Sequence, residues 1–335
     1  MDMLTVIQQF FRYMTRDKDT LYVICPFNIG DFLINGGLCH ALLKRKRKKT
    51  CVLIEKERFA DSGLNFVGVK EVQYIPQTLM DIIRQYIYAT REYETDNYVY
   101  GHFQMIKNFE DWNTGLIRNE NLPFVSDYKE TVFKLPLDTE LIPPIINTPT
   151  DFQKQRLHES YVLDKGRTII LTPYANSTAN LEESFWARLV SELKQKNKDY
   201  VIYTNVASPR AKVITGTTPI VTTFTELFYL AEKVNCFIGL RSGILDLLAF
   251  TNARLLYVNN SINWKADLNI NFNHTNSRAF YIASASDQMS IKNFMQQNNI
   301  NSISIDDINF YGHVEGKNVA LNTDSLLEKI ISAVN

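Results

Sequence analysis

The chain has 335 residues, of which 45% are hydrophobic and 21% charged, and its 36 basic residues balance 36 acidic ones. This size and composition predict a soluble protein of two domains, and the zero net charge argues against a general nucleic-acid binder, which is usually basic. No apolar run reaches the roughly 18 residues that a membrane span needs. The four cysteines have no C-x-x-C spacing, which favours a reducing cytoplasm over a disulfide or metal framework.

The first third of the chain alternates between strand and helix patterns. Its N-terminal segment has apolar residues at helical spacing and predicts an amphipathic helix rather than a signal peptide. Short apolar runs then predict strands at residues 21–25, 51–54, 72–75 and 98–100. Helical periodicity predicts helices at residues 32–43 and 80–88. Such alternation is typical of parallel βαβ units.

The stretch at residues 135–150 contains four prolines, which exclude regular helix and stiffen the chain. We therefore expect it to connect two domains. Beyond it, strands are expected at residues 168–171, 200–204, 236–239 and 254–258. Helices are expected at residues 151–164, 182–196, 225–233, 245–250 and 323–334, and residues 259–285 read as loops. This rhythm predicts an α/β fold of two doubly wound domains that face each other across a cleft.

One candidate binding segment is G-L-R-S-G at residues 239–243, between a predicted strand and a predicted helix. Ligands of open parallel sheets bind at the carboxyl ends of strands, where helices begin. Free backbone N–H groups there suit a phosphate, and Ser242 adds a hydroxyl. Gly243 lets an anion approach the backbone, and Arg241 offers a planar fork for oxygens. The alternative is that Ser242 is only an N-cap and Arg241 a surface residue.

A second polar loop follows the predicted strand at residues 168–171 and leads into the helix at 182–196. Its side chains Asn176, Ser177 and Thr178 are candidates to hold phosphate or ribose oxygens. The alternative is a polar loop with an ordinary cap. Two such loops leave neighbouring strands of one domain, and together they are stronger evidence for a binding site than either loop alone.

The turn P-F-N-I-G-D at residues 26–31 marks a strand exit in the first half. Gly30 permits a tight turn, and Asp31 is either a helix N-cap worth ~1 kcal/mol or a general base. Asn28 and Gly30 are candidates for the acceptor side of the cleft. His102, which follows the strand at 98–100, is a third candidate, with core packing as its alternative.

Two charged patterns have simpler interpretations. The run K-R-K-R-K-K begins at Lys44 and ends at Lys49, after a predicted helix, where cations are favourable in any case. Its functional alternative is peripheral docking on anionic lipid. The D-K-D at residues 17–19 formally matches a metal motif but precedes the first strand, so we interpret it as a solvated turn. The histidines show no metal-ligand spacing, and no metal site is expected.

The segment N-I-G-D-F-L-I-N-G-G-L-C-H-A-L-L-K-R, which begins at Asn28, resembles the G-D-x-L stretch of the lipopolysaccharide heptosyltransferases and their relatives, glycosyltransferase family nine. The second half is similar to the nucleotide domain of this family. It has a loop with small hydroxyl residues, a helix with Trp186, a helix at 225–234, and then F-I-G-L-R-S-G-I-L-D-L-L-A-F. Family members carry Gly-x-Asp-Ser/Thr-Gly and a helix at this last point. The resemblance spans most of residues 21–258.

The resemblance implies a GT-B fold with a Rossmann-like acceptor domain at residues 1–150 and a nucleotide-sugar domain at 151–335. The last helix is a candidate for packing back on the first domain. The resemblance also implies sugar transfer without a required metal or cofactor, with Asp31 as the base and Ser242 and Gly243 in a diphosphate-binding turn. Two departures stand out: Arg241 replaces an aspartate of the family, and no lysine precedes Trp186. One interpretation is that Arg241 supplies the missing cation.

We therefore expect an inverting glycosyltransferase that moves a sugar from a nucleotide-diphosphate donor to a glycan or glycolipid in bacterial surface polysaccharide synthesis. Its expected location is the cytoplasm, with the inner face of the membrane as the alternative. A nucleotide-sugar epimerase and a non-catalytic, glycosyltransferase-like binding subunit stay open. A dehydrogenase is disfavoured because no G-x-G-x-x-G follows a predicted strand.

Overall fold

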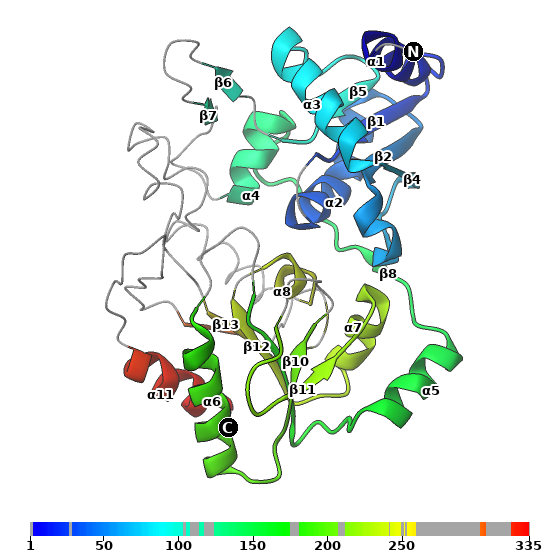
Figure 1. The fold of residues 1–335 in the computed structure, drawn as a ribbon. Helices are drawn as coiled ribbons and strands as arrows, with labels where there is room; N and C mark the ends of the chain where they lie inside the picture. Colours follow the sequence, from blue (N-terminus) through cyan, green and yellow to red (C-terminus); the bar gives the residue numbers. More distant parts are fainter. Residues whose placement is uncertain are drawn as a thin grey trace. The chain divides into compact units, whose positions relative to one another are not determined.

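The computed structural model describes residues 3–26, 29–102, 105–107, 114–116, 124–174, 181–206, 212–240, 242–248, 251, 253–258, 302–305 and 323–334. The chain divides into two compact units, Met1–Asn147 and Thr148–Asn335. Each unit is built around a parallel β-sheet with helices packed on it (Figure 1). The predicted α/β class with doubly wound sheets is therefore confirmed.

The first unit contains a four-stranded parallel sheet of order β4-β2-β1-β5. Its strands are β1 (Thr20–Ile24), β2 (Thr50–Lys56), β4 (Val69–Ile75) and β5 (Tyr98–Tyr100). Its long helices are α1 (Met3–Met14), α2 (Ile29–Lys46) and α3 (Gln77–Thr90). The predicted strands and helices are all present, and α2 and α3 each extend beyond the predicted bounds at both ends. The order places β1 beside β5, the strand farthest from it along the chain.

Aromatic side chains connect α1 to the sheet of the first unit. The ring of Phe11 lies 5.0 Å from that of Tyr86 on α3 and 5.2 Å from that of Tyr98 on β5. Burial of such rings is the main favourable contribution to packing of this kind. The amphipathic N-terminal segment therefore completes the core on this face of the sheet.

Several short elements of the first unit have no counterpart in the sequence prediction. The segment after β2 forms η1 (Glu57–Ser62) and β3 (Leu64–Asn65), and β3 pairs antiparallel with β8 (Ile145–Ile146). Strands β6 (Met105–Lys107) and β7 (Thr114–Leu116) form a separate antiparallel pair. A short helix α4 (Phe124–Asp127) continues into η2 (Tyr128–Val132). These elements are too short to give a periodic pattern.

The proline-rich stretch, predicted to connect two domains, is attached to the first unit as far as the boundary after Asn147. The backbone N–H of Ile142 donates a hydrogen bond to the carbonyl of Gly37 on α2, 3.0 Å away. A Cβ atom at Gly37 would lie 2.6 Å from Leu141 Cδ1 and 2.8 Å from the Ile142 carbonyl oxygen. Only glycine therefore permits this contact. Ile146 pairs with Leu64 a few residues later.

The second unit contains a six-stranded parallel sheet of order β11-β10-β9-β12-β13-β14. The strands are β9 (Thr168–Thr172), β10 (Val201–Asn205), β11 (Thr218–Ile220), β12 (Cys236–Leu240), β13 (Leu255–Val258) and β14 (Ser302–Ile305). In sequence order this is 3-2-1-4-5-6, the arrangement of dinucleotide-binding folds. Neither β11 nor β14 was predicted, and the stretch at 259–285, expected as loops, lies outside the described residues.

The helices of the second unit are α5 (Asp151–Ser160), α6 (Glu183–Lys196), α7 (Phe224–Ala231), α8 (Gly243–Leu248) and α11 (Thr323–Val334). Thr150 and Thr223 each form a capping box at the start of a helix, which fixes where α5 and α7 begin.

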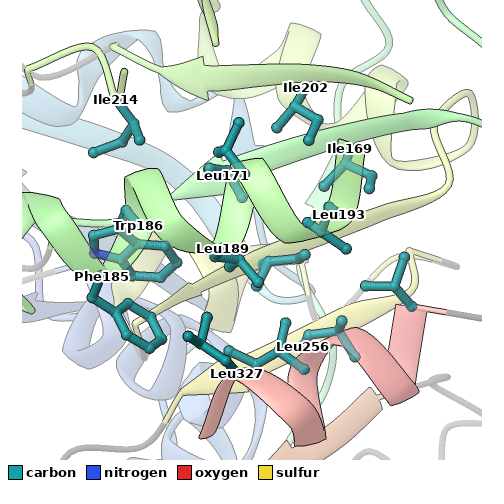
Figure 2. Packing of buried hydrophobic residues seen from close by; sticks show 14 of the residues in the cluster. Ile169, Leu171, Phe185, Trp186, Leu189, Leu193, Ile202, Ile214, Leu256 and Leu327 are labelled. Atoms are coloured by element: carbon teal, nitrogen blue, oxygen red, sulfur yellow. The ribbon is translucent and has the colours of Figure 1, made fainter. Parts of the chain in front are cut away.

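The core of the second unit lies between its sheet and the helices α6 and α11 (Figure 2). Trp186 on α6 is fully buried there, together with Leu171 of β9, Leu256 of β13 and Leu327 of α11. Helices α6 and α11 lie side by side in Figure 1 and are in contact. The contacts described for the last helix, α11, are thus with its own unit.

Candidate functional site

The first group of predicted site residues lies at the carboxyl ends of β1 and β5. These two strands are neighbours, whereas β2 and β4 lie on the other side of β1. Loops diverge at such a switch point, which is where doubly wound sheets bind ligands. Gly30 and Asp31 follow β1 and His102 follows β5, so the fold places these three at one edge of the sheet. Asn28 lies outside the described residues.

Asp31 lies inside the first turn of α2, because this helix begins at Ile29. The N-cap role considered for Asp31 is therefore wrong. A carboxylate in the first turn is instead stabilised by the positive end of the helix dipole. This placement keeps an acidic side chain at the edge of the sheet.

Tyr128 contacts Asp31 directly. Its hydroxyl donates a hydrogen bond of 2.6 Å to Asp31 Oδ1, and the phenol ring is fully buried. The ring centroids of Tyr128 and His102 are 6.1 Å apart, in an edge-to-face arrangement. His102 is itself 7% exposed, so its side chain is part of this packing. We call Asp31, Tyr128 and His102 the Asp31 cluster.

A buried asparagine joins the two loops that carry this cluster. Asn35, one turn after Asp31 on α2, donates through Nδ2 to the carbonyl of Gly101, 3.0 Å away. The backbone N–H of Gly101 donates to the carbonyl of Ile24 at the end of β1. A Cβ atom at Gly101 would lie 2.5 Å from Asn35 Oδ1, so glycine is required for this approach. The helix of Asp31 and the loop of His102 are thereby held together.

Two ionisable residues at the end of β2 are buried close to the Asp31 cluster. Glu55 is fully buried, and its Oε1 accepts a hydrogen bond from the backbone N–H of Lys56, 2.7 Å away. Burial raises the pKa of Glu55, and the charge of Asp31 acts in the same direction. Burial also lowers the pKa of Lys56. Neither residue was predicted from the sequence, because the charged run E-K-E-R at residues 55–58 is typical of a solvent-exposed segment.

The second group of predicted residues follows β9 and β12 of the other sheet. These strands are adjacent in space, and the register pairs Gly239 of β12 with Thr172 of β9. A Cβ atom at Gly239 would lie 1.9 Å from Thr172 Oγ1 and 2.3 Å from its carbonyl oxygen. The strands approach this closely only because residue 239 has no side chain. The polar loops after β9 and β12 therefore begin beside each other.

Two hydroxyl groups at this edge, Thr172 Oγ1 and Ser242 Oγ, are buried and have no hydrogen-bond partner in the part of the chain that the structure describes. A buried hydroxyl without a partner costs free energy, so such groups often mark a ligand site. Ser242 directly precedes α8, whose first residue is Gly243, but its side chain makes no capping bond.

The other residues predicted for the donor site lie outside the described residues. They are Asn176, Ser177, Thr178 and Arg241. Of this predicted set, the structure describes Ser242 and Gly243, and it adds Thr172. Thr172 follows the predicted strand at residues 168–171, and only the register of β9 against β12 shows that it lies beside Gly239, at the start of the second loop.

The basic run predicted as a possible lipid contact is largely engaged within the first unit. Arg45, Lys46 and Lys134 all form ion pairs with the carboxylate of Glu94, which precedes β5. Lys48 donates hydrogen bonds to the carbonyl of Lys18 and to Asn97 Oδ1, and Lys49 pairs with Asp19. The end of α2 is thus tied to the segments before β1 and β5.

We expect Glu94→Gln to lower the free energy of unfolding by about 1.5 kcal/mol at pH 7, as for a partly buried charge-assisted hydrogen bond. Burial tends to raise the pKa of Glu94, but hydrogen bonds from Lys134, Lys46 and Arg45 outweigh it and lower the pKa to about 2. The stabilisation that the ionised Glu94 provides is fully present above the unfolded-state pKa of 4.5. It should disappear as the pH falls from 4.5 towards 2.

Urea unfolding between pH 3 and pH 7 measures this difference. Asp19→Asn removes the exposed pair with Lys49 and serves as the control, with an expected effect below ~0.5 kcal/mol. Equal effects of the two substitutions would contradict a stabilising role for the Glu94 ion pairs.

The described residues contain no group of three histidine, cysteine or acidic side chains arranged to hold a metal ion. Asp17 and Asp19, which formally matched a metal motif, take part in a turn: Asp17 accepts hydrogen bonds from Thr20 and from the backbone N–H of Asp19. No helix in this part of the chain is long and apolar enough to cross a membrane.

Comparison with known proteins gives a likeness in structure but none in sequence. No family model matches the sequence, and no curated protein is similar to it. A family 9 glycosyl transferase from Veillonella parvula DSM 2008 is similar in structure, with a TM-score of 0.56 and 11% sequence identity, over 95% of this chain and 98% of the other. ADP-heptose lipopolysaccharide heptosyltransferase II of E. coli gives a TM-score of 0.51 and 13% identity, over 94% of this chain and 98% of the other. The chain therefore has the fold of the family 9 glycosyltransferases.

Proposed function

We propose that this protein is a glycosyltransferase that moves a sugar from a nucleotide-diphosphate donor to a hydroxyl of a glycan or glycolipid. One observation carries the proposal: each of its two Rossmann-like sheets presents polar groups at its switch point. The first has a carboxylate, Asp31, and the second has the hydroxyls of Thr172 and Ser242, which have no partner among the described residues. A fold shared with family 9 glycosyltransferases along almost the whole chain supports this assignment.

In the proposed mechanism, Asp31 removes the proton of the acceptor hydroxyl while the oxygen attacks the anomeric carbon of the donor. The bond from that carbon to the nucleotide diphosphate breaks in the same step, so the configuration inverts. Negative charge develops on the leaving diphosphate. Arg241, the hydroxyl of Ser242 and the backbone N–H groups of Ser242 and Gly243 stabilise it. No metal ion is needed in this scheme, and transfer should persist in the presence of a chelator.

The donor pocket differs from the family pattern in its charge. An arginine replaces the family's aspartate at position 241, and no lysine stands in the loop before Trp186. In our proposal Arg241 is the cation that neutralises the diphosphate, and Asn176, Ser177 and Thr178 bind further donor oxygens. The heptosyltransferase similar in structure is named for ADP-heptose. For this chain we propose only the class of donor, a nucleotide-activated sugar.

We expect Arg241→Ala to weaken binding of a nucleoside diphosphate about tenfold to a hundredfold, since an arginine–phosphate contact is a charge-assisted hydrogen bond. Isothermal titration calorimetry with nucleoside diphosphates measures this directly. Arg188→Ala, on the exposed face of α6 and paired with Glu192, is the matched control and should bind as the wild type does. Equal affinity of the Arg241 variant and the wild type would remove Arg241 from the donor site.

On the acceptor side we place Asn28, Gly30 and His102 near the base. The acceptor belongs to bacterial surface polysaccharide synthesis in our proposal, and the enzyme works in the cytoplasm or at the inner face of the membrane. Lys44 and Arg47 are the exposed members of the basic run for which no ion pair is seen in the described part. Sedimentation with vesicles that contain or lack anionic lipid tests whether this surface binds a membrane.

A panel of nucleotide sugars tests the proposed function. A donor at 100 times its dissociation constant stabilises the native state by about 2.7 kcal/mol and raises the melting temperature. Any donor so identified is then incubated with and without glycan or glycolipid acceptors, and products are analysed. Transfer supports the proposal, conversion of the donor alone would indicate an epimerase, and donor binding without any turnover would indicate a non-catalytic binding subunit.

A further inference from the structure

The contact between Tyr128 and Asp31 has a geometry that suits control of the base. The phenol hydroxyl lies 2.6 Å from Asp31 Oδ1, a length typical of a hydrogen bond from a hydroxyl to a carboxylate. Tyr128 is fully buried and cannot rotate freely, because its ring packs against those of His102 and Phe133. The donor therefore has a fixed position relative to the first turn of α2.

We propose that Tyr128 is the positioning residue of the base: its hydroxyl holds the Asp31 carboxylate in one orientation and stabilises the ionised form that accepts a proton. This inference rests on the proposed function, in which Asp31 is the general base. The hydroxyl of Tyr128 donates to Oδ1 of the carboxylate that takes the acceptor proton in the proposed mechanism. Tyr128 itself acts through Asp31 and exchanges no proton.

The phenol of Tyr128 is a permanent donor. Burial raises the pKa of Tyr128 well above its ordinary value, and the neighbouring charge of Asp31 acts in the same direction. The hydroxyl therefore keeps its proton at every pH at which the protein works. A hydrogen bond that is donated to the ionised form of a carboxyl group lowers the proton affinity of that group.

Other titratable groups also act on Asp31 or on its donor and must be considered in any pH profile. They come from each element around the cluster: Cys25 after β1, Glu55 and Lys56 at the end of β2, and His102 after β5. Burial raises the pKa of Cys25, so this thiol stays neutral. None of these four side chains is altered by a substitution at Tyr128 that keeps the ring.

Tyr128→Phe tests the proposal, because it removes one oxygen atom and keeps the ring that packs against His102 and Phe133. We expect kcat to fall about tenfold, and the acid limb of the pH–rate profile to move up by about one pH unit, while donor affinity stays unchanged. Tyr98→Phe is the matched control. It removes another buried hydroxyl, which donates to the carbonyl of Glu92 at 2.8 Å, and should leave the acid limb in place.

Incorporation of 3,5-difluorotyrosine at position 128 keeps the hydroxyl and makes it a stronger donor, so the acid limb should move to lower pH. In parallel, a carbon-13 NMR titration of the Asp31 carboxyl group, assigned with Asp31→Asn, reads the same shifts in the full chain without any substrate. A wild-type protein that transfers no sugar would count against the proposed function alone. An Asp31 titration that is identical in wild type and Tyr128→Phe would overturn the role of Tyr128.

Discussion

Replacing Asp31 with asparagine should lower sugar transfer by a factor of about 1,000 or more and leave nucleotide binding intact. A positioned general base contributes about 100-fold to 10,000-fold, and an amide cannot accept the proton of the acceptor hydroxyl. The substitution hardly changes the shape of the side chain. The hydroxyl of Tyr128 can still donate to the amide oxygen at position 31, so the packing of Tyr128 against His102 should persist.

Product formation with a donor identified by thermal shift measures the first effect, and calorimetry with a nucleoside diphosphate measures the second. Asp17→Asn is the control: it neutralises a carboxylate of the D-K-D turn, which binds Thr20 and lies at the opposite end of β1. Full transfer activity in Asp31→Asn would disprove the base assignment. Loss of nucleotide binding would instead mean that Asp31 supports the structure of the protein.

Gly239→Ala should strongly disrupt the second sheet. The new Cβ atom would lie 1.9 Å from Thr172 Oγ1 and 2.3 Å from the Thr172 carbonyl oxygen, far inside van der Waals contact. Strands β9 and β12 would have to separate at their carboxyl ends. Overpacking of this kind costs typically 1–3 kcal/mol, and we expect about 3 kcal/mol because backbone atoms must move.

Urea unfolding gives the change in stability, and calorimetry should show that nucleotide binding is lost, since the loops that follow β9 and β12 start beside Gly239. The double variant Gly239→Ala, Thr172→Ala should not recover stability, because the carbonyl of Thr172 would still clash. Gly166→Ala is the control: its Cβ atom would meet the Asp164 carboxylate at 3.2 Å. A stable Gly239→Ala protein with normal nucleotide binding would contradict the close pairing of these strands.

The alternation of apolar runs and helical periods was sufficient to predict the four-stranded sheet and the four inner strands of the six-stranded sheet, but not its edge strands β11 and β14. Each buried strand, such as Cys236–Leu240, is a short continuous apolar run, and each covering helix has a 3.6-residue period. The edge strand β11 was missed because T-P-I has only three residues, two of them exposed. The short helices α4 and η2 were missed because they contain one or two turns and no cap signal.

Candidate site residues could be predicted only where they directly follow a predicted strand. Asp31, Ser242 and Gly243 became candidates because they come directly after predicted strands. Tyr128 and Glu55 were not found, since their role depends on which side chains meet in space. Tyr128 lies 97 positions from Asp31 along the chain, and no local pattern records that contact.

The attachment of the proline-rich stretch to α2 also determines where the chain can be divided for experiments on its parts. A first half that ended at residue 134 would lack Leu141, Ile142 and the strand β8. It would thus expose the bare backbone of Gly37 and leave β3 without its antiparallel neighbour. A division between residues 147 and 150 keeps these contacts in the first half. If it is made before Thr150, the second half also keeps the threonine that caps α5. Truncation boundaries should therefore fall within these few residues.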